Sequence, residues 1–239
     1  MKQPNRLKAA IRENRVAFGY DLHFPSTHII EILGPLDFDF VWIDGEHGPF
    51  SLEQVEEICR AAELVGVTPI ARVPNTRSST ILQYLDRGIQ GILGPHINSK
   101  ANAEQLVRAC YFGPLGERSF GGNRGTDYGY GIPDMGAYYE QCNQNILVGA
   151  LLEDEDVVEN LDEILTVPGI DYFSIGPNDF AQGLGYPGGA RHETVVEAME
   201  AVYTRIKQAG RHVGRDAMAS IHVKEMLTGS AKSFLERMR

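Results

Sequence analysis

The feature that most limits what this chain can fold into is a repeated alternation of short apolar runs with amphipathic stretches. Runs typical of buried strands lie at Val16–Leu22, Phe38–Ile43, Thr68–Val73, Gln90–Leu93, Ile146–Leu152 and Asp171–Ile175. Helical periodicity lies between or after them, at Thr27–Leu33, Leu52–Leu64, Ser79–Arg87, Lys100–Tyr111, Val157–Leu165 and Glu193–Ala209. Such alternation implies parallel strands joined by right-handed crossovers.

The number of these units favours a single α/β domain over residues 1–239, folded as a (β/α)₈ TIM barrel rather than an open sheet. A weak seventh strand is predicted at His212–Gly214. Ser220–Val223 could supply the eighth, and it leads directly into an amphipathic helix at Met226–Arg239. The last unit is therefore expected to be abbreviated. Gly113–Asn145 is rich in Gly and is predicted to be a long loop, either functional or a surface insertion.

Charge and composition argue against several classes of binding partner. The net charge is −10, which argues against a nucleic-acid partner. No apolar run is long enough to span a bilayer, and the N-terminus lacks the apolar middle of a signal peptide. Cys59, Cys110 and Cys142 have no metal-binding spacing and are interpreted as buried or unreactive thiols. These features together predict a cytoplasmic protein without a nucleic-acid or membrane partner.

Titratable side chains follow several predicted strands, at the end where an α/β barrel carries its chemistry. Glu153 and Asp179 each come after an apolar strand. Two carboxylates and water suit a hard divalent cation such as Mg²⁺ or Mn²⁺. The alternative is that either acid only caps the next helix, and the neighbouring acids Asp154, Glu155 and Asp156 support that alternative.

Three other positions allow a catalytic and a structural interpretation. Arg72 ends the strand PIAR and could hold a carboxylate or enolate oxygen, or form a structural ion pair. His47 follows a strong strand beside Asp44 and could be a general base, or a capping or core histidine. The turn Gly176–Pro177–Asn178–Asp179 could bind a small carboxylate through its N–H groups, or be an ordinary turn.

Two further observations concern the reaction. Asp86, in YLDRG, indicates on its own only a solvated acid near a turn. No lysine follows an apolar strand where a Schiff base would form, and no serine lies in a nucleophile-elbow pattern. For an enzyme acting on a carbonyl compound, metal activation is the route that the sequence leaves.

Taken together, these segments resemble the HpcH/HpaI family of metal-dependent pyruvate aldolases. The resemblance rests on FDFVWIDGEHGPFS, ARVP, ILQYLDRGIQGILGPHINS, FGPLGERSFGG, LLEDEDVVENLDEILTVPGIDYFSIGPNDF and GLGYPG, in the family's order. It implies a (β/α)₈ barrel in a homo-oligomer, a trimer or a hexamer, whose C-terminal helix packs on a neighbour.

The resemblance also implies roles for individual residues. Glu153 and Asp179 would ligate Mg²⁺ or Mn²⁺, and Arg72 would contact the pyruvate oxygens. His47 would act in acid/base catalysis, with Asp86 coupled to it and Asp44 in support. The turn formed by Gly176, Pro177, Asn178 and Asp179 would supply amides to the substrate carboxylate.

The implied reaction is reversible aldol cleavage of a 4-hydroxy-2-oxo acid to pyruvate and an aldehyde, through an enolate that the metal stabilises as a Lewis acid. Substrates of this kind are 2-keto-3-deoxy sugar acids and 4-hydroxy-2-oxoheptanedioate, from sugar acid or aromatic catabolism. Oxaloacetate decarboxylation at the same site and a non-catalytic relative that binds small acids are the alternatives.

The sequence departs from the family's pattern at three places. Leu151 stands where a Gln is common, and Asp154 replaces a small hydroxyl residue. The C-terminal unit is also shorter than the family's. The first change removes a possible hydrogen bond to substrate, so it bears on substrate choice and rate.

Overall fold

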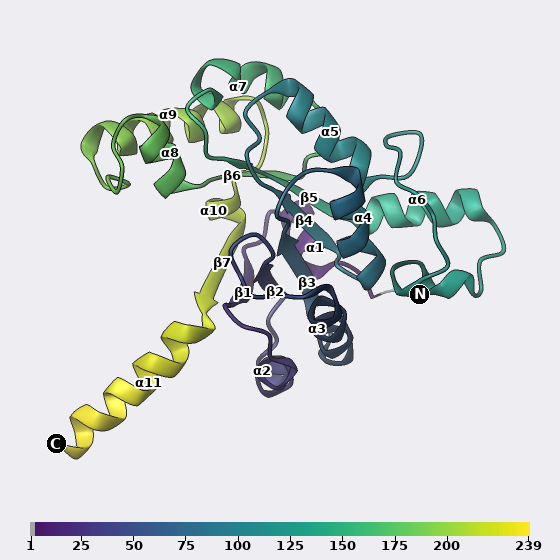
Figure 1. Ribbon diagram of the computed structural model, residues 1–239, viewed down its shortest axis with the longest axis horizontal. Helices are drawn as coiled ribbons and strands as arrows, with labels where there is room; N and C mark the ends of the chain where they lie inside the picture. The colour runs from purple at the N-terminus through teal and green to yellow at the C-terminus, as the bar shows by residue number, and fades with distance from the viewer. Residues whose placement is uncertain (1–2) are drawn as a thin grey trace.

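A computed structural model describes residues 3–239 as helices arranged around one curled parallel sheet (Figure 1). Seven strands pair in the order β6-β5-β4-β3-β2-β1-β7. They are β1 (Ala17–Leu22), β2 (Phe40–Asp44), β3 (Thr68–Arg72), β4 (Gly91–Gly94), β5 (Leu147–Leu152), β6 (Tyr172–Ile175) and β7 (Met218–His222). The predicted α/β class with parallel, barrel-like strands is confirmed.

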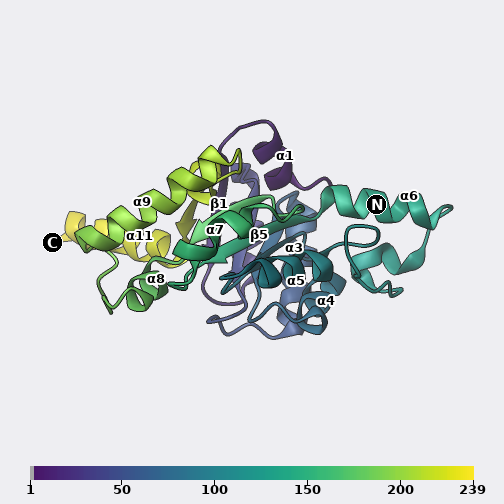
Figure 2. The ribbon, with the colours of Figure 1, turned by 90° about the horizontal axis from the view of Figure 1, so that it is seen from above.

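Helices follow the strands and cover the outer face of the sheet (Figure 2). Six of them match the predicted positions: α2 (Thr27–Leu33), α3 (Leu52–Val65), α4 (Ser78–Arg87), α5 (Lys100–Cys110), α7 (Val157–Leu165) and α9 (Glu193–Gln208). Among residues 3–239, no helix combines the length and the apolar character needed to cross a bilayer.

Local sequence signals explain where these helices begin and end. Ser51 and Gln54 form a reciprocal capping box at the start of α3, and Ser99 accepts a hydrogen bond from an N–H in the first turn of α5. Gly66 and Gly88 take left-handed conformations directly after α3 and α4. The chain can therefore turn back into β3 and β4 without strain.

The barrel interior is filled by large side chains packed over glycines of neighbouring strands. A Cβ added at Gly91 would lie 2.4 Å from Ile70, and one at Gly149 would lie 2.3 Å from the Tyr172 ring. A helix not predicted from the sequence, α1 (Arg6–Arg12), closes the amino end of the barrel with buried Leu7 and Ile11. Its apolar side chains therefore belong to the same interior cluster as Phe40 of β2.

The barrel is not closed by eight complete strands, which corrects the sequence prediction. His212–Gly214 forms only an isolated bridge between Val213 and Phe173 of β6. A single helical turn, α10 (Gly214–Ala217), then leads into β7, which pairs with β1 over five positions. Because so few residues connect the bridge to β7, no full crossover helix fits, and the abbreviated C-terminal unit is confirmed.

Two segments extend away from the barrel (Figure 1). The predicted loop Gly113–Asn145 contains α6 (Met135–Asn145) and the 3₁₀ helix η2 (Arg124–Gly129), so the loop prediction was wrong for these residues. Helix α6 has no buried residue, which explains its weak apolar periodicity. The C-terminal helix α11 (Val223–Met238) leaves the barrel after β7 and has only Val223 buried. The remaining elements are η1 (Gly34–Leu36) and α8 (Pro177–Gly183).

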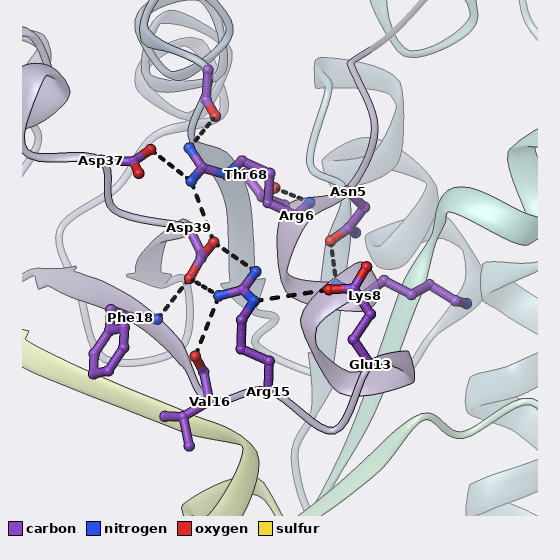
Figure 3. A network of polar contacts seen from close by, with 11 residues as sticks. Asn5, Arg6, Lys8, Glu13, Arg15, Val16, Phe18, Asp37, Asp39 and Thr68 are labelled. Carbon is purple, nitrogen blue, oxygen red and sulfur yellow. Dashed lines mark hydrogen bonds and ion pairs between the residues drawn. The ribbon is translucent and has the colours of Figure 1, made fainter.

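A buried carboxylate ties α1 to the sheet (Figure 3). Both oxygens of Asp39 accept hydrogen bonds from Arg15, at 2.8 and 3.1 Å, and Oδ2 also accepts from the N–H of Phe18 at 2.9 Å. Arg6 of α1 lies 3.4 Å from Oδ1. Burial opposes ionisation of Asp39, but these contacts prevail and hold its pKa below the ordinary value.

Replacing Asp39 with Asn should lower the free energy of unfolding by about 1–3 kcal/mol at pH 7, because charge-assisted hydrogen bonds are lost. Since the folded-state pKa is depressed, the difference between the two proteins should be complete above about pH 4 and shrink as the pH falls further. Urea denaturation as a function of pH measures it. Asp37→Asn is the matched control because Asp37 is 86% exposed. An equal effect of both changes would contradict the assignment.

Candidate active site

An ion pair joins the carboxyl ends of β2 and β3. Asp44 and Arg72 are register partners, and Nε of Arg72 lies 3.0 Å from Oδ1 of Asp44. A second guanidinium nitrogen donates to Oδ2. Glu46 adds another carboxylate, 3.3 Å from Nε of Arg72. Burial opposes the charge of Asp44, but hydrogen bonds from Arg72 and two backbone N–H groups keep its pKa below the ordinary value.

Asp44 also shapes the turn that carries His47. Its Oδ1 accepts hydrogen bonds from the N–H groups of Glu46 and His47, both at 3.1 Å. Residue 45, between Asp44 and Glu46, has to be glycine, because a Cβ there would lie 2.3 Å from the Tyr84 hydroxyl. The His47 side chain is 67% exposed, with Nε2 3.9 Å from Oε2 of Glu46. His47 is therefore not a core histidine. Its ring is open to solvent beside the ion pair and has no close contact with Glu46.

Glu153 is the most deeply buried acid of the site, with 2% of its side chain exposed. Its Oε1 accepts a hydrogen bond from the N–H of His96 at 3.0 Å. Burial raises the pKa of Glu153, against the lowering effect of that hydrogen bond. A Cβ on Gly176 would lie 2.5 Å from Oε2 of Glu153, so the bare backbone at Gly176 makes room for the carboxylate.

His96 connects the two halves of the site. It has a left-handed backbone, with φ of 53°, and its Nδ1 lies 3.2 Å from Oδ1 of Asp154. Its Nε2 lies 3.8 Å from Oε1 of Glu46. No role was assigned to His96 from the sequence, and Glu46 was considered only as a carboxylate that could orient His47. The signal was available, because His96 follows β4 by two residues just as the other site residues follow their strands.

Glu153 and Asp179 face the same cleft, which has a volume of about 340 Å³ and is also lined by His96, Asn98 and Asp154. Asp179 is exposed in the first turn of α8. Within residues 3–239, no group of three or more His, Cys, Asp or Glu side chains is placed to hold a metal ion. The two expected ligands thus share a cleft without forming a complete set of protein ligands.

The turn after β6 can supply fewer amides than the sequence suggested. The N–H of Gly176 already donates to Leu152 at 3.2 Å, and Pro177 has no N–H. The N–H groups of Asn178 and Asp179 are in the first turn of α8, where a helix has no internal acceptor for them. Any amide contact to a carboxylate would therefore come from Asn178 and Asp179.

The structure does not bring Asp86 to His47 within one chain. Asp86 lies in the last turn of α4, before β4 begins, whereas His47 follows the end of β2. In a parallel sheet these positions belong to opposite ends of the barrel. The charged partner of Asp86 is Arg118, at 3.9 Å. The coupling implied by the family resemblance is therefore absent from this chain taken alone.

The two site positions that depart from the family pattern have different surroundings. Leu151 is buried in the interior cluster, one inward-facing position before Glu153, and gives the site an apolar floor. Asp154 pairs with His96, and its Oδ2 is buried without a hydrogen-bond partner. The site thus has two fewer neutral polar groups and one more carboxylate than the pattern.

Comparison with known proteins agrees with this geometry. A model of the HpcH/HpaI aldolase/citrate lyase family matches residues 22–233. The chain belongs to this family. Its members include class II pyruvate aldolases, which are metal-dependent carbon–carbon lyases.

Individual relatives cover most of the chain. A hydroxypyruvate/pyruvate aldolase of Rhizorhabdus wittichii is 36% identical over 213 residues, 88% of this chain and 82% of the relative. A 2-keto-3-deoxy-L-rhamnonate aldolase of Escherichia coli is 32% identical over 227 residues, 95% of this chain and 84% of the relative. A solved HpcH/HpaI aldolase/citrate lyase family protein from Burkholderia cenocepacia, 26% identical, superimposes with a TM-score of 0.87, covering 98% of this chain and all of that one.

Gly176→Ala should lower the free energy of unfolding by about 1–3 kcal/mol, because the new methyl group overlaps the Glu153 side chain. Thermal and urea denaturation measure the change. Gly229→Ala is the matched control, since nothing lies within 4 Å of a Cβ at that helical position. It should leave stability unchanged or raise it by about 1 kcal/mol. Equal stability of Gly176→Ala and the parent chain would show that Glu153 is not held as described.

Proposed function

We propose that this chain catalyses the reversible aldol cleavage of a 4-hydroxy-2-oxo acid to pyruvate and an aldehyde. The observation that carries the proposal is the convergence of Arg72, His47 and Glu153 at the carboxyl ends of three strands, with Asp179 in the same cleft as Glu153. Family membership and the names of the relatives support the reaction class.

A divalent cation fits the donors of this cleft. Glu153 and Asp179 offer carboxylate oxygens, which Mg²⁺ and Mn²⁺ prefer. A cation would also compensate the burial that raises the pKa of Glu153. With so few protein ligands, the rest of the coordination would come from substrate and water. When bound, the ion would supply Lewis acidity toward the 2-oxo group.

The protein's own residues have separate roles in the proposed reaction. Arg72, held by Asp44 and Glu46, presents positive charge to the oxygens of the 2-oxo acid and stabilises the charge that develops there. His47 takes the proton of the 4-hydroxyl group at a ring nitrogen. The C3–C4 bond then breaks, its electron pair stays on C3 as pyruvate enolate, and C4 leaves as the aldehyde carbon. Protonation at C3 completes pyruvate.

The first test is exchange of the C3 protons of pyruvate in D₂O, followed by NMR, since it reports enolate formation without any aldehyde. Exchange should require added Mn²⁺ or Mg²⁺ and stop with EDTA. Glu153→Gln should reduce metal-dependent exchange by at least about 100-fold, because a buried ligand carboxylate is lost. Glu159→Gln, the same change at an exposed position of α7, should retain exchange.

The outcomes separate the candidate functions. Exchange together with aldehyde-dependent turnover supports the aldolase, whereas exchange with CO₂ release from oxaloacetate and no aldol turnover supports a decarboxylase on the same site. Bound metal without exchange would refute both and favour a small-acid-binding protein, which is supported by Leu151 at the Gln position and by the abbreviated C-terminal unit.

We also propose that the chain forms a homo-oligomer, a trimer or hexamer, through α11. Leu227, Phe234 and Met238 lie on one side of this helix and are exposed. Phe18 and Ile221 are exposed on the outer face of β1 and β7, where this chain places no crossover helix. Both surfaces are apolar, and a neighbouring copy's α11 would cover the second.

Replacing both Leu227 and Phe234 with Glu should convert the assembly to a smaller species, because each charge would have to be buried without a partner. Sedimentation velocity measures the mass. Lys232→Glu introduces the same residue on another side of α11 and should leave the mass unchanged. An unchanged mass for the double variant would show that α11 is not the interface.

A further inference from the structure

A second polar cluster lies on the inner side of the barrel, at the ends of β1 and β7. Oδ2 of Asp21 accepts a hydrogen bond from the Ser220 hydroxyl at 3.0 Å, and Nδ1 of His222 lies 3.1 Å from the same oxygen. The ring of His23 meets the ring of His222 edge to face, with centroids 4.7 Å apart. None of these residues belongs to the network around Arg72 and Glu153.

Strand alternation places this cluster inside the barrel. Ala17 belongs to the interior cluster, and Asp21, four residues later on β1, faces the same way. Met218 packs against that interior cluster, and Ser220 and His222 follow it at intervals of two residues on β7. The side chains therefore face the barrel interior, as Asp44 and Arg72 do at the ends of β2 and β3.

Trp42 separates the cluster from Arg72. Asp21 is the register partner of Trp42, and the Arg72 guanidinium carbon lies 5.8 Å from the Trp42 ring centroid. Arg72 is two strands away from Asp21 and two residues further along, which corresponds to roughly 10–12 Å. Pyruvate held at Arg72 would not reach Asp21, but the aldehyde-derived end of a longer substrate would extend toward it.

The chemistry of the cluster selects hydroxyl groups. Asp21 is 7% exposed, and both of its contacts fall on Oδ2. Nδ1 of His222 is buried without an aligned hydrogen-bond partner. Such groups favour a ligand that both donates and accepts hydrogen bonds. An alkyl chain would leave them unpaired. A second carboxylate would meet the carboxylates of Asp21 and Glu225, while the nearest ring, that of His222, already lies against Asp21.

We propose that Asp21, Ser220 and His222 form the subsite for the aldehyde-derived end of the substrate, and that this end carries hydroxyl groups rather than a carboxylate or an alkyl chain. The assignment rests on the proposed aldolase function, because it takes the pyruvate end to lie at Arg72. It makes Asp21 and His222 specificity-determining residues that take no part in breaking the C3–C4 bond.

The test compares aldol addition of pyruvate to glyceraldehyde, propanal and succinic semialdehyde. The parent chain should have the highest kcat/KM for glyceraldehyde, by about 10-fold or more over the other two. Asp21→Asn and His222→Asn should each lower kcat/KM for glyceraldehyde by about 10-fold, mainly through KM, and change that for propanal by less than about 2-fold. Asp37→Asn, at the opposite end of the barrel, is the matched control and should change neither.

Metal-dependent exchange of the pyruvate C3 protons separates this proposal from the one on which it rests. Exchange at the parent rate in Asp21→Asn, combined with the selective loss on glyceraldehyde, would support the subsite. Equal losses for glyceraldehyde and propanal, or lost exchange in a folded variant, would overturn it by showing a structural or chemical role. A preference of the parent chain for succinic semialdehyde would overturn the substrate class. Absence of exchange in the parent chain would refute the proposed function itself.

Discussion

The parallel pairing of β2 with β3 is the constraint on which the rest of the site depends. Five residues of each strand are in register, and the last pair is Asp44 with Arg72. Because neighbouring parallel strands present their inward side chains at the same level, this register puts a carboxylate beside a guanidinium without any loop to position them. A shift of either strand by one residue would turn its own charged side chain toward the helices and separate the pair. The ion pair then fixes the turn that carries Glu46 and His47.

The opposite wall of the site combines close packing with a second acid–histidine pair. Gly176 leaves room for the carboxylate of Glu153, and the left-handed backbone of His96 directs an N–H toward it. The His96 ring lies closer to Asp154 than to Glu153. Leu151 closes the space below. Arg72 is thus already compensated by acids, while Glu153 has one hydrogen bond from His96 and longer contacts with its ring.

Strands and helices could be predicted from the sequence where a run of neighbouring residues is buried in a regular pattern. They could not be predicted where burial depends on contacts with distant parts of the chain. Six strands were found because their apolar runs are buried on both sides. Helix α1 was missed although Leu7, Ala10 and Ile11 have helical spacing, because the pattern spans only two turns and its burial against the barrel interior comes from distant contacts. Helix α6 was missed because it buries nothing. Among site residues, those directly after strands were found, whereas Asp86 was assigned to His47 from a motif although the fold places them at opposite ends.

The acidic side chains of the site outnumber the basic ones. Asp44, Glu46, Glu153 and Asp154 have largely buried side chains, and the basic side chains placed near them are Arg72, His96 and, at a longer distance, His47. Burying more carboxylates than cations is unfavourable for folding. A divalent cation would relieve this imbalance, whereas a second carboxylate on the substrate would add to it. The excess of negative charge thus supports the proposed cation at Glu153, and it disfavours a substrate that carries a further carboxylate.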